Sequence, residues 1–113
     1  MKIVATIEAR MSSKRLPGKV LKRLDGMPSL ELQIRRMQRS RLIDDIVLAT
    51  TNKDTDDIIA DFAEDLGVHV FRGSEEDVLS RILGAAQSVE GDLQVQITGD
   101  CPLIDSTIID EYI

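Results

Sequence analysis

The sequence of 113 residues is 42% hydrophobic and 30% charged and contains no tryptophan, which is typical of one globular domain and not of a disordered chain. Its formal net charge of −6 argues against a general binder of nucleic acid or of anionic membranes, because such proteins need clustered lysine and arginine. The single cysteine excludes an internal disulfide framework and a multi-cysteine zinc site, and no apolar run approaches the roughly 18 residues of a membrane span, so we expect a cytoplasmic protein.

The first predicted element is a strand over residues 2–9. Its letters, KIVATIEA, are apolar and β-branched without polar alternation, which is typical of a central strand covered on both faces. Residues 10–27 mix serine, glycine and proline, so we expect a long irregular loop there. Six basic residues and no acidic one lie between Arg10 and Arg23. Loops of this length in compact domains usually bind something.

Helices and strands alternate along the rest of the chain. The spacing predicts an amphipathic helix from Ser29, which would be its N-cap, with Leu30, Ile34 and Met37 on the apolar face. A buried strand over 46–50 precedes a second helix over 54–66, which Gly67 ends. The predicted apolar face of this second helix consists of Ile58, Ile59, Phe62, Ala63 and Leu66.

The third unit begins with a short strand over 68–71, and residues 74–77 (SEED) resemble a capping box that opens a third helix. The predicted apolar face of that helix consists of Val78, Leu79, Ile82, Leu83 and Ala86. A fourth strand over 92–98 and a last helix, capped by Asp105 or Ser106, complete the pattern. This βαβαβαβα order predicts a three-layer α/β fold with a doubly wound, mostly parallel sheet.

Ligands of such sheets bind beyond the carboxyl ends of the strands, where the strand order reverses. The basic loop follows the first strand, and Gly99 and Asp100 follow the fourth. If these strands are neighbours, a polyanion in the loop lies beside a carboxylate able to carry a divalent cation, which is what a nucleoside triphosphate with Mg²⁺ requires. No G-x-G-x-x-G follows the first strand, and Gly18-Lys19 lacks the rest of a P-loop.

The loop resembles a known signature. Residues 8–19 (EARMSSKRLPGK) are similar to the signature loop of the sugar cytidylyltransferases, which activate acylneuraminate and 3-deoxy-manno-octulosonate, and residues 99–104 (GDCPLI) resemble the metal-site motif of that family. Residues 71–79 (FRGSEEDVL) look most like the branch named for spore coat polysaccharide biosynthesis protein F. The resemblance covers essentially the whole chain.

This resemblance implies a Rossmann-like nucleotide-diphospho-sugar transferase fold. Residues 1–113 would be a single nucleotide-binding domain, the N-terminal portion of a longer cytidylyltransferase, because the last predicted helix has no stop signal. The implied activity is transfer of CMP from CTP to an acidic or related sugar with release of pyrophosphate, in the synthesis of polysaccharide or glycoconjugate precursors. The implied partners are CTP and a sugar acceptor, and a homodimer of the full-length enzyme is compatible with the resemblance.

The resemblance also implies roles for single residues. Arg10 and Lys19 would hold the triphosphate, and Asp100 would bind the Mg²⁺ cofactor; these three are the implied catalytic residues. The implied nucleotide-binding residues are Ala9, Arg10, Ser12, Ser13, Lys19, Thr50, Gly73 and Ser74, with Ala49 next to Thr50.

Structural interpretations remain open beside these roles. Asp100 also fits a turn or a helix cap, and Ser74 fits a cap as well as it fits a contact with the base. Arg81 is equally compatible with the surface and with the site. We interpret His69 and Cys101 as structural residues.

Three other functions also stay open. One is a nucleotide-binding module without turnover. Another is a nucleotide-sugar glycosyltransferase, although Pro102 stands where the second aspartate of its usual Asp-x-Asp motif would fall. The last is an RNA-binding protein, which the net charge of −6 and the shortage of aromatic residues oppose.

Overall fold

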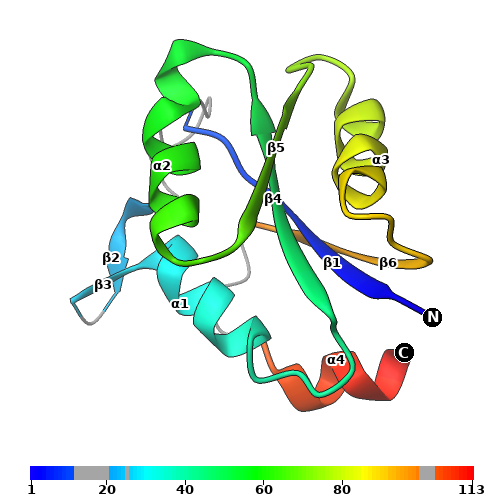
Figure 1. The fold of residues 1–113 in the computed structure, drawn as a ribbon. Coiled ribbons are helices and arrows are strands. Elements are labelled where there is room, and N and C mark those ends of the chain that lie inside the picture. The colour runs from blue at the N-terminus through cyan, green and yellow to red at the C-terminus, as the bar shows by residue number, and fades with distance from the viewer. Residues whose placement is uncertain (12–20, 25, 100–103) are drawn as a thin grey trace.

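Four parallel strands form the main sheet of the computed structural model, which describes residues 1–11, 21–24, 26–99 and 104–113 (Figure 1). The strands are β1 (Ile3–Glu8), β4 (Asp45–Thr51), β5 (His69–Gly73) and β6 (Leu93–Thr98). Their order across the sheet is β5-β4-β1-β6, so the first and fourth predicted strands are neighbours. The expected doubly wound α/β architecture is confirmed.

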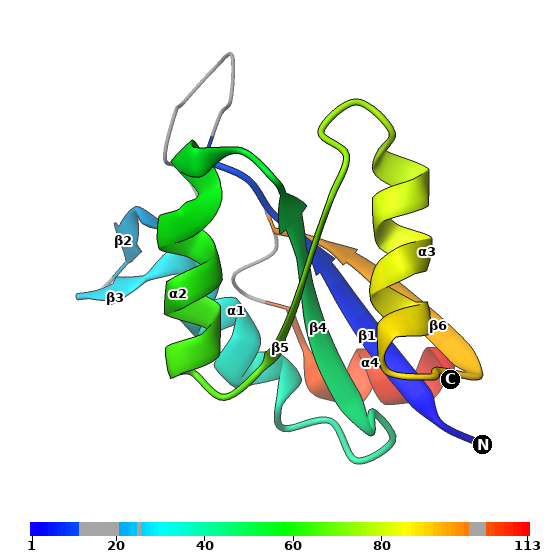
Figure 2. The same cartoon turned by 45° about the horizontal axis from the view of Figure 1, so that its top comes forward.

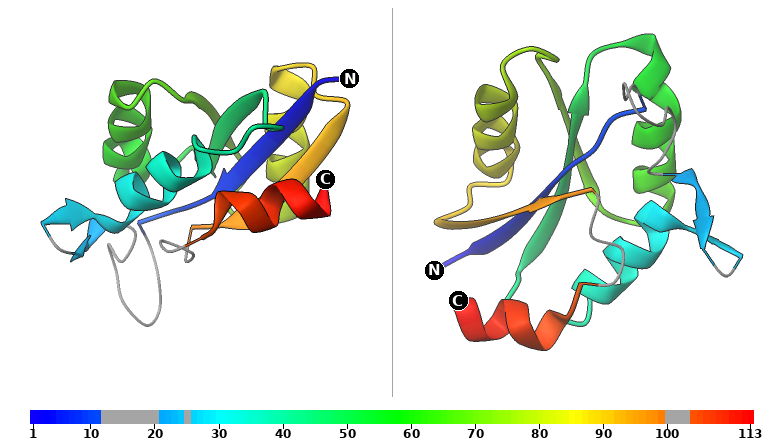
Figure 3. Two further views of the ribbon diagram at one scale, coloured as in Figure 1. Left: turned by 90° about the horizontal axis from the view of Figure 1, so that it is seen from below. Right: turned by 180° about the vertical axis from the view of Figure 1, so that it is seen from behind.

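Helices cover both faces of this sheet. On one face lie α1 (Ser29–Met37), α2 (Asp57–Asp65), which follows the short 3-10 helix η2 (Asp54–Asp56), and α4 (Ser106–Tyr112); α3 (Val78–Ser88) covers the other (Figures 2 and 3). The larger core packs residues such as Ile7, Leu30 and Ile59 between the sheet and the first group of helices. Among the described helices, none has the length and apolar character to cross a membrane.

A small hairpin precedes α1, where the sequence predicted only an irregular loop. Its strands, β2 (Arg23–Leu24) and β3 (Met27–Pro28), are antiparallel, and Gly26 between them has a φ of +82°. A glycine adopts that conformation without the strain that a side chain brings. Strands of two residues are too short to show a periodicity, so the sequence pattern missed them.

The prediction that Ser29 caps α1 is wrong. Ser29 is the first helical residue, and Pro28 stands at the cap position without a side-chain hydrogen bond. The backbone N–H of Ser29 donates to the carbonyl of Lys22 at 2.8 Å, so the hairpin satisfies one of the free donors of the first turn. The prediction that Asp105 caps α4 is confirmed, because its carboxylate accepts the N–H of Thr107 at 2.8 Å.

The apolar faces of α2 and α3 differ from the predicted ones. Ile58, Leu79 and Leu83 are 55%, 65% and 46% exposed, whereas the buried side of α3 consists of Arg81, Ile82, Ala85 and Ala86. Gly84 explains the orientation of α3, because a Cβ there would lie 2.5 Å from the ring of Phe71 on β5. This close approach turns the leucines outward.

Candidate functional site

The carboxyl ends of all four strands meet at one edge of the sheet. The backbone N–H of Gly99, just after β6, donates to the carbonyl of Glu8 at 2.8 Å, and a Cβ on Gly99 would lie 2.8 Å from that same oxygen. The N–H of Ala9 donates to the carbonyl of Ala49 at 3.2 Å. Ala9, which leads into the basic loop, and Gly99, which precedes Asp100, therefore lie side by side. This meets the condition of neighbouring strands on which the sequence prediction depended.

Some predicted site residues fall outside the part of the chain that the structure describes. These are Ser12, Ser13, Lys19 and Asp100. The structure does bring the other predicted residues to the edge. Ala9 is beside Ala49, and Thr50 is next to Thr51, which is paired with Gly73 on β5. The Thr50 hydroxyl is buried and has no hydrogen-bond partner among the described residues.

Asp56 holds the chain where the basic loop begins. Its carboxylate is 1% exposed; Oδ1 accepts the backbone N–H of Met11 at 2.7 Å, and Oδ2 accepts the hydroxyl of Thr51. The residue after Arg10 is thereby tied to the end of β4. Sequence reasoning missed this role because Asp56 stands in an acidic first turn, where carboxylates usually face solvent.

The turn after β5 corrects the predicted capping box. Ser74 Oγ accepts the N–H of Asp77 at 3.0 Å, but this bond closes a turn ahead of the helix. Asp77 is the N-cap of α3, and its Oδ1 accepts the N–H of Ser80 at 3.0 Å. Asp77 is favoured as the cap because its carboxylate lies where the first free N–H groups of the helix point. Contact of Ser74 with a base stays a prediction.

Arg81 lies beneath that turn and is 1% exposed. Nη1 donates to the carbonyl of Ser74 at 2.9 Å, and Nη2 lies 3.5 Å from the carboxylate of Glu8. Gly73 makes room for it, because a Cβ there would lie 3.2 Å from Cγ of Arg81. The alternative of a surface position is therefore wrong: this arginine joins the end of β1 to the turn after β5.

Charged side chains cluster above the same edge. Glu75 in the turn after β5 forms ion pairs with Arg10, at 3.8 Å, and with Lys53, which follows β4. Arg72 pairs with Asp57 at 2.6 Å. Lys53 was not among the predicted residues, although its place directly after a strand is a signal that sequence reading can use. The side chains of Arg10 and Lys53 are thus the exposed cations that this edge can offer to an anionic ligand.

The lowered carboxyl pKa values lie elsewhere. A hydrogen bond from Lys2 lowers the pKa of Asp45, which begins β4 at the opposite edge of the sheet. His69 lies 3.5 Å from this carboxylate, in keeping with a structural role for that histidine. A hydrogen bond from Ser40 lowers the pKa of Asp110 in α4. Within the described ranges no group of three carboxylate, histidine or cysteine side chains is placed to hold a metal ion.

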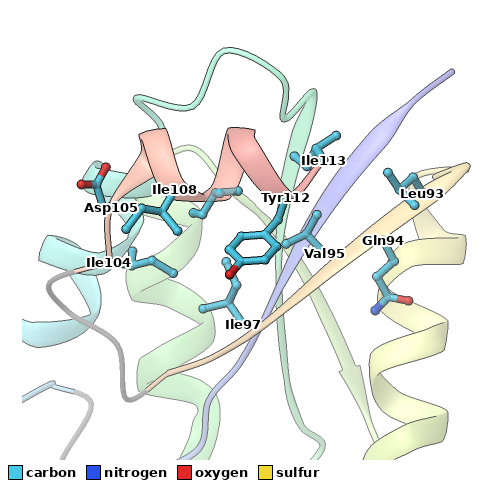
Figure 4. Close-up of a pocket in the computed structure, with 10 residues that line it drawn as sticks. Leu93, Gln94, Val95, Ile97, Ile104, Asp105, Ile108, Tyr112 and Ile113 are labelled. Carbon is cyan, nitrogen blue, oxygen red and sulfur yellow. The ribbon is translucent and has the colours of Figure 1, made fainter.

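An apolar pocket of about 470 Å³ lies between β6 and α4, apart from the charged edge (Figure 4). Side chains from both elements face it, including Val95, Ile97, Ile108 and Tyr112. It contains none of the predicted nucleotide-binding residues. The pocket is therefore distinct from the candidate site.

The fold agrees with what the chain resembles. A family model described as cytidylyltransferase matches residues 4–113. The spore coat polysaccharide biosynthesis protein SpsF of Bacillus subtilis is 39% identical over 115 residues, which cover 98% of this chain and 48% of that protein. The chain spans about half the length of the curated relatives it matches.

Solved structures of cytidylyltransferases have a similar fold. A cytidylyltransferase from Leptospira borgpetersenii superposes with a TM-score of 0.92 at 41% identity, over 98% of this chain and 47% of that one. A CMP:2-keto-3-deoxy-manno-octonic acid synthetase solved with CTP superposes with a TM-score of 0.84 at 23% identity, over 98% of this chain and 45% of that one, which bears on the fold alone. The chain belongs to the cytidylyltransferase family.

Proposed function

We propose that this chain is the nucleotide-binding part of a CTP-dependent nucleotidyltransferase. The reaction moves CMP from CTP to a sugar hydroxyl and releases pyrophosphate, in the synthesis of polysaccharide or glycoconjugate precursors. The observation that carries the proposal is the adjacency of β1 and β6. This adjacency brings Ala9, which leads into the basic loop, and Gly99, which precedes Asp100, to one edge of the sheet, in a chain whose family is named for this chemistry.

The proposed reaction needs no side-chain nucleophile. The sugar oxygen forms a bond to the α-phosphorus, the bond from that phosphorus to the bridging oxygen of the β-phosphate breaks, and the hydroxyl proton is released. Negative charge grows on the phosphate oxygens and on the leaving pyrophosphate. Arg10 and Lys19 hold these groups and neutralise that charge, and preorganised cations of this kind are an effective means of stabilising a transition state.

Asp100 is the residue that would hold Mg²⁺. This cation is usually bound by one or two carboxylates together with the substrate phosphates, and the carboxylate of Asp100 is a donor of that kind. Glu8, at the end of β1, is ion-paired with Arg81 at 3.5 Å. When bound, the ion supplies charge neutralisation at the phosphate oxygens.

Gly73 and Ser74 would lie near the base, with Ala49 and Thr50 at the end of the strand beside that pocket, and the loop backbone at Ser12 and Ser13 would help to hold the triphosphate. The register that pairs Thr51 with Gly73 supports this grouping. A cytoplasmic location, a homodimer and a role in spore coat formation remain proposals of the same kind.

The test is a titration of the isotope-labelled chain with Mg²⁺ and each of CTP, UTP, ATP and GTP, followed by amide NMR. We expect selective shifts with CTP at residues 9–19, 73–74 and 99–101. No shift with any nucleotide up to millimolar concentration contradicts the proposal. Tight RNA binding that falls steeply with salt, or consumption of a UDP-sugar, would favour the RNA-binding or the glycosyltransferase alternative.

A second candidate function is a binding module without turnover. It is favoured by the fact that the chain spans about half the length of its curated relatives. Pyrophosphate release from CTP in the presence of sugar acceptors separates the two. CTP binding without pyrophosphate release supports the module, and release supports the transferase.

A further inference from the structure

Three neighbouring strands each place a charged residue two positions beyond their last residue. Arg10 follows β1 in this way, Lys53 follows β4 and Glu75 follows β5. Because these strands are adjacent in the sheet, the three side chains meet at its edge. The Glu75 carboxylate lies 3.8 Å from Nη1 of Arg10 and is also ion-paired with Nζ of Lys53.

The backbone of Lys53 is fixed on both sides. Its N–H donates to Oγ1 of Thr51 at 3.2 Å, and its carbonyl accepts Nη2 of Arg72 at 2.8 Å. Arg72 uses its other donors on the carbonyl of Thr51 and on Asp57, so its guanidinium is occupied within the protein. The Lys53 side chain, by contrast, is 57% exposed, so it can reach a ligand without any backbone movement.

Glu75 is presented by an equally fixed turn. The carbonyl of the preceding residue, Ser74, accepts a hydrogen bond from the buried Arg81, and the Ser74 hydroxyl accepts the N–H of Asp77. The Glu75 side chain is 27% exposed, less than either of its cations. Ion pairs that involve exposed lysine and arginine contribute little to stability, so a more highly charged anion can replace this carboxylate.

We propose that Lys53 is a further anion-binding residue of this site, and that Glu75 occupies in the free protein the position that a phosphate group of the ligand takes between Lys53 and Arg10. The inference rests on the proposed function insofar as the ligand is a polyphosphate. A phosphate group carries more charge than a carboxylate and accepts more charge-assisted hydrogen bonds, so it displaces Glu75 from both cations. Until a phosphate group binds, the Glu75 carboxylate keeps Lys53 and Arg10 together, and it lowers the affinity of the site for anions of lower charge.

The experiment is calorimetric titration of the 113-residue chain with inorganic tripolyphosphate at fixed ionic strength. Glu75→Gln is expected to tighten binding by about three- to tenfold, because it removes a competing charge while keeping the side-chain shape. Glu76→Gln is the matched control: it makes the same charge change one residue away, at an exposed position without an ion pair to any described residue. It should change the affinity by less than about twofold.

Lys53→Met is expected to weaken tripolyphosphate binding by about tenfold, as the loss of a charged hydrogen-bond donor does. Arg39→Met, an exposed cation near the end of α1, controls for net charge. The proposal is overturned if the Glu75→Gln variant binds tripolyphosphate no more tightly than the Glu76→Gln variant does. It is also overturned if Lys53→Met and Arg39→Met lower the affinity equally, or if no variant binds tripolyphosphate. Tripolyphosphate has no nucleobase, so its binding does not depend on selectivity for CTP. A failure of CTP selectivity would therefore contradict the proposed function without affecting the roles of Lys53 and Glu75.

Discussion

The guanidinium of Arg81 lies 3.5 Å from the carboxylate of Glu8, between α3 and the central sheet. Burying an arginine is costly unless it is paired and hydrogen-bonded. Here Nη1 donates to the carbonyl of Ser74 and Nη2 is ion-paired with Glu8, whereas Nε has no hydrogen-bond partner among the described residues. Arg81 thereby connects the strand that leads into Arg10 with the turn that presents Glu75. The same contacts stabilise the fold and organise the candidate site.

Replacing Arg81 with methionine should destabilise the protein, because Glu8 then loses its counter-charge. We expect the free energy of unfolding to fall by about 2–3 kcal/mol, less than for a fully buried pair because the Glu8 side chain is 27% exposed. Urea denaturation measures the change. Arg39→Met removes an exposed arginine and should cost less than about 0.5 kcal/mol. Equal losses in the two variants would show that the pair does not stabilise the fold.

Gly84→Ala should also destabilise the protein, even though alanine favours a helix. The added methyl would lie 2.5 Å from Cζ of Phe71, and overpacking of this kind costs about 1–3 kcal/mol, against a gain of about 1 kcal/mol from helix propensity. Thermal unfolding measures the balance. Ser80→Ala, at an exposed position of the same helix, should be neutral or stabilising. A higher melting temperature for Gly84→Ala would mean that Phe71 moves aside freely.

Ser40→Ala should raise the pKa of Asp110 toward its ordinary value of 3.8. The hydrogen bond from the Ser40 hydroxyl is the main cause of the lowered pKa, followed by the backbone N–H of Arg41. Since the pKa of the folded state is lowered, the stabilisation is fully present above pH 3.8 and is lost as pH falls through the lowered pKa. An NMR titration of the carboxyl groups measures the pKa of Asp110.

The control for this titration is Asp45. Its pKa is also lowered, but mainly by the hydrogen bond from Lys2, so Ser40→Ala should leave it unchanged. Lys2→Met should do the reverse, raising the pKa of Asp45 and leaving that of Asp110 as it is. If the pKa values of Asp45 and Asp110 both change in either variant, the cause is a change of the fold and not the loss of one hydrogen bond.

Lys19→Ala should weaken binding of CTP far more than binding of CMP, because the proposed role of Lys19 is to hold the phosphates beyond the first. Loss of a charged hydrogen bond corresponds to roughly tenfold or more in affinity for CTP. Calorimetry with both nucleotides gives the comparison, and Lys22→Ala, in the same basic stretch, should alter neither affinity appreciably. Equal losses for CTP and CMP would rule out the proposed role.

The sequence by itself determined the architecture and predicted the place of the site. Hydrophobic patterns repeat locally, so the runs of β1 and β4 and the spacing of Leu30, Ile34 and Met37 predicted strands and a helix in the right order. Parallel strands end at a common edge, so the sequence alone predicted that the basic loop after β1 and Gly99 after β6 belong to one site. The cytidylyltransferase motif added the expected chemistry.

Only the tertiary structure decided which side chains face each other across elements. The rotation of α3 about its own axis depends on the contact between Gly84 and Phe71, so its pattern alone did not predict that Arg81 is buried and Leu79 exposed. The meeting of Lys53 with Glu75 likewise depends on strand order, because 22 positions of sequence separate residues that the sheet brings into contact. Periodicity is local, whereas charge pairing at the edge is set by the packing of distant segments.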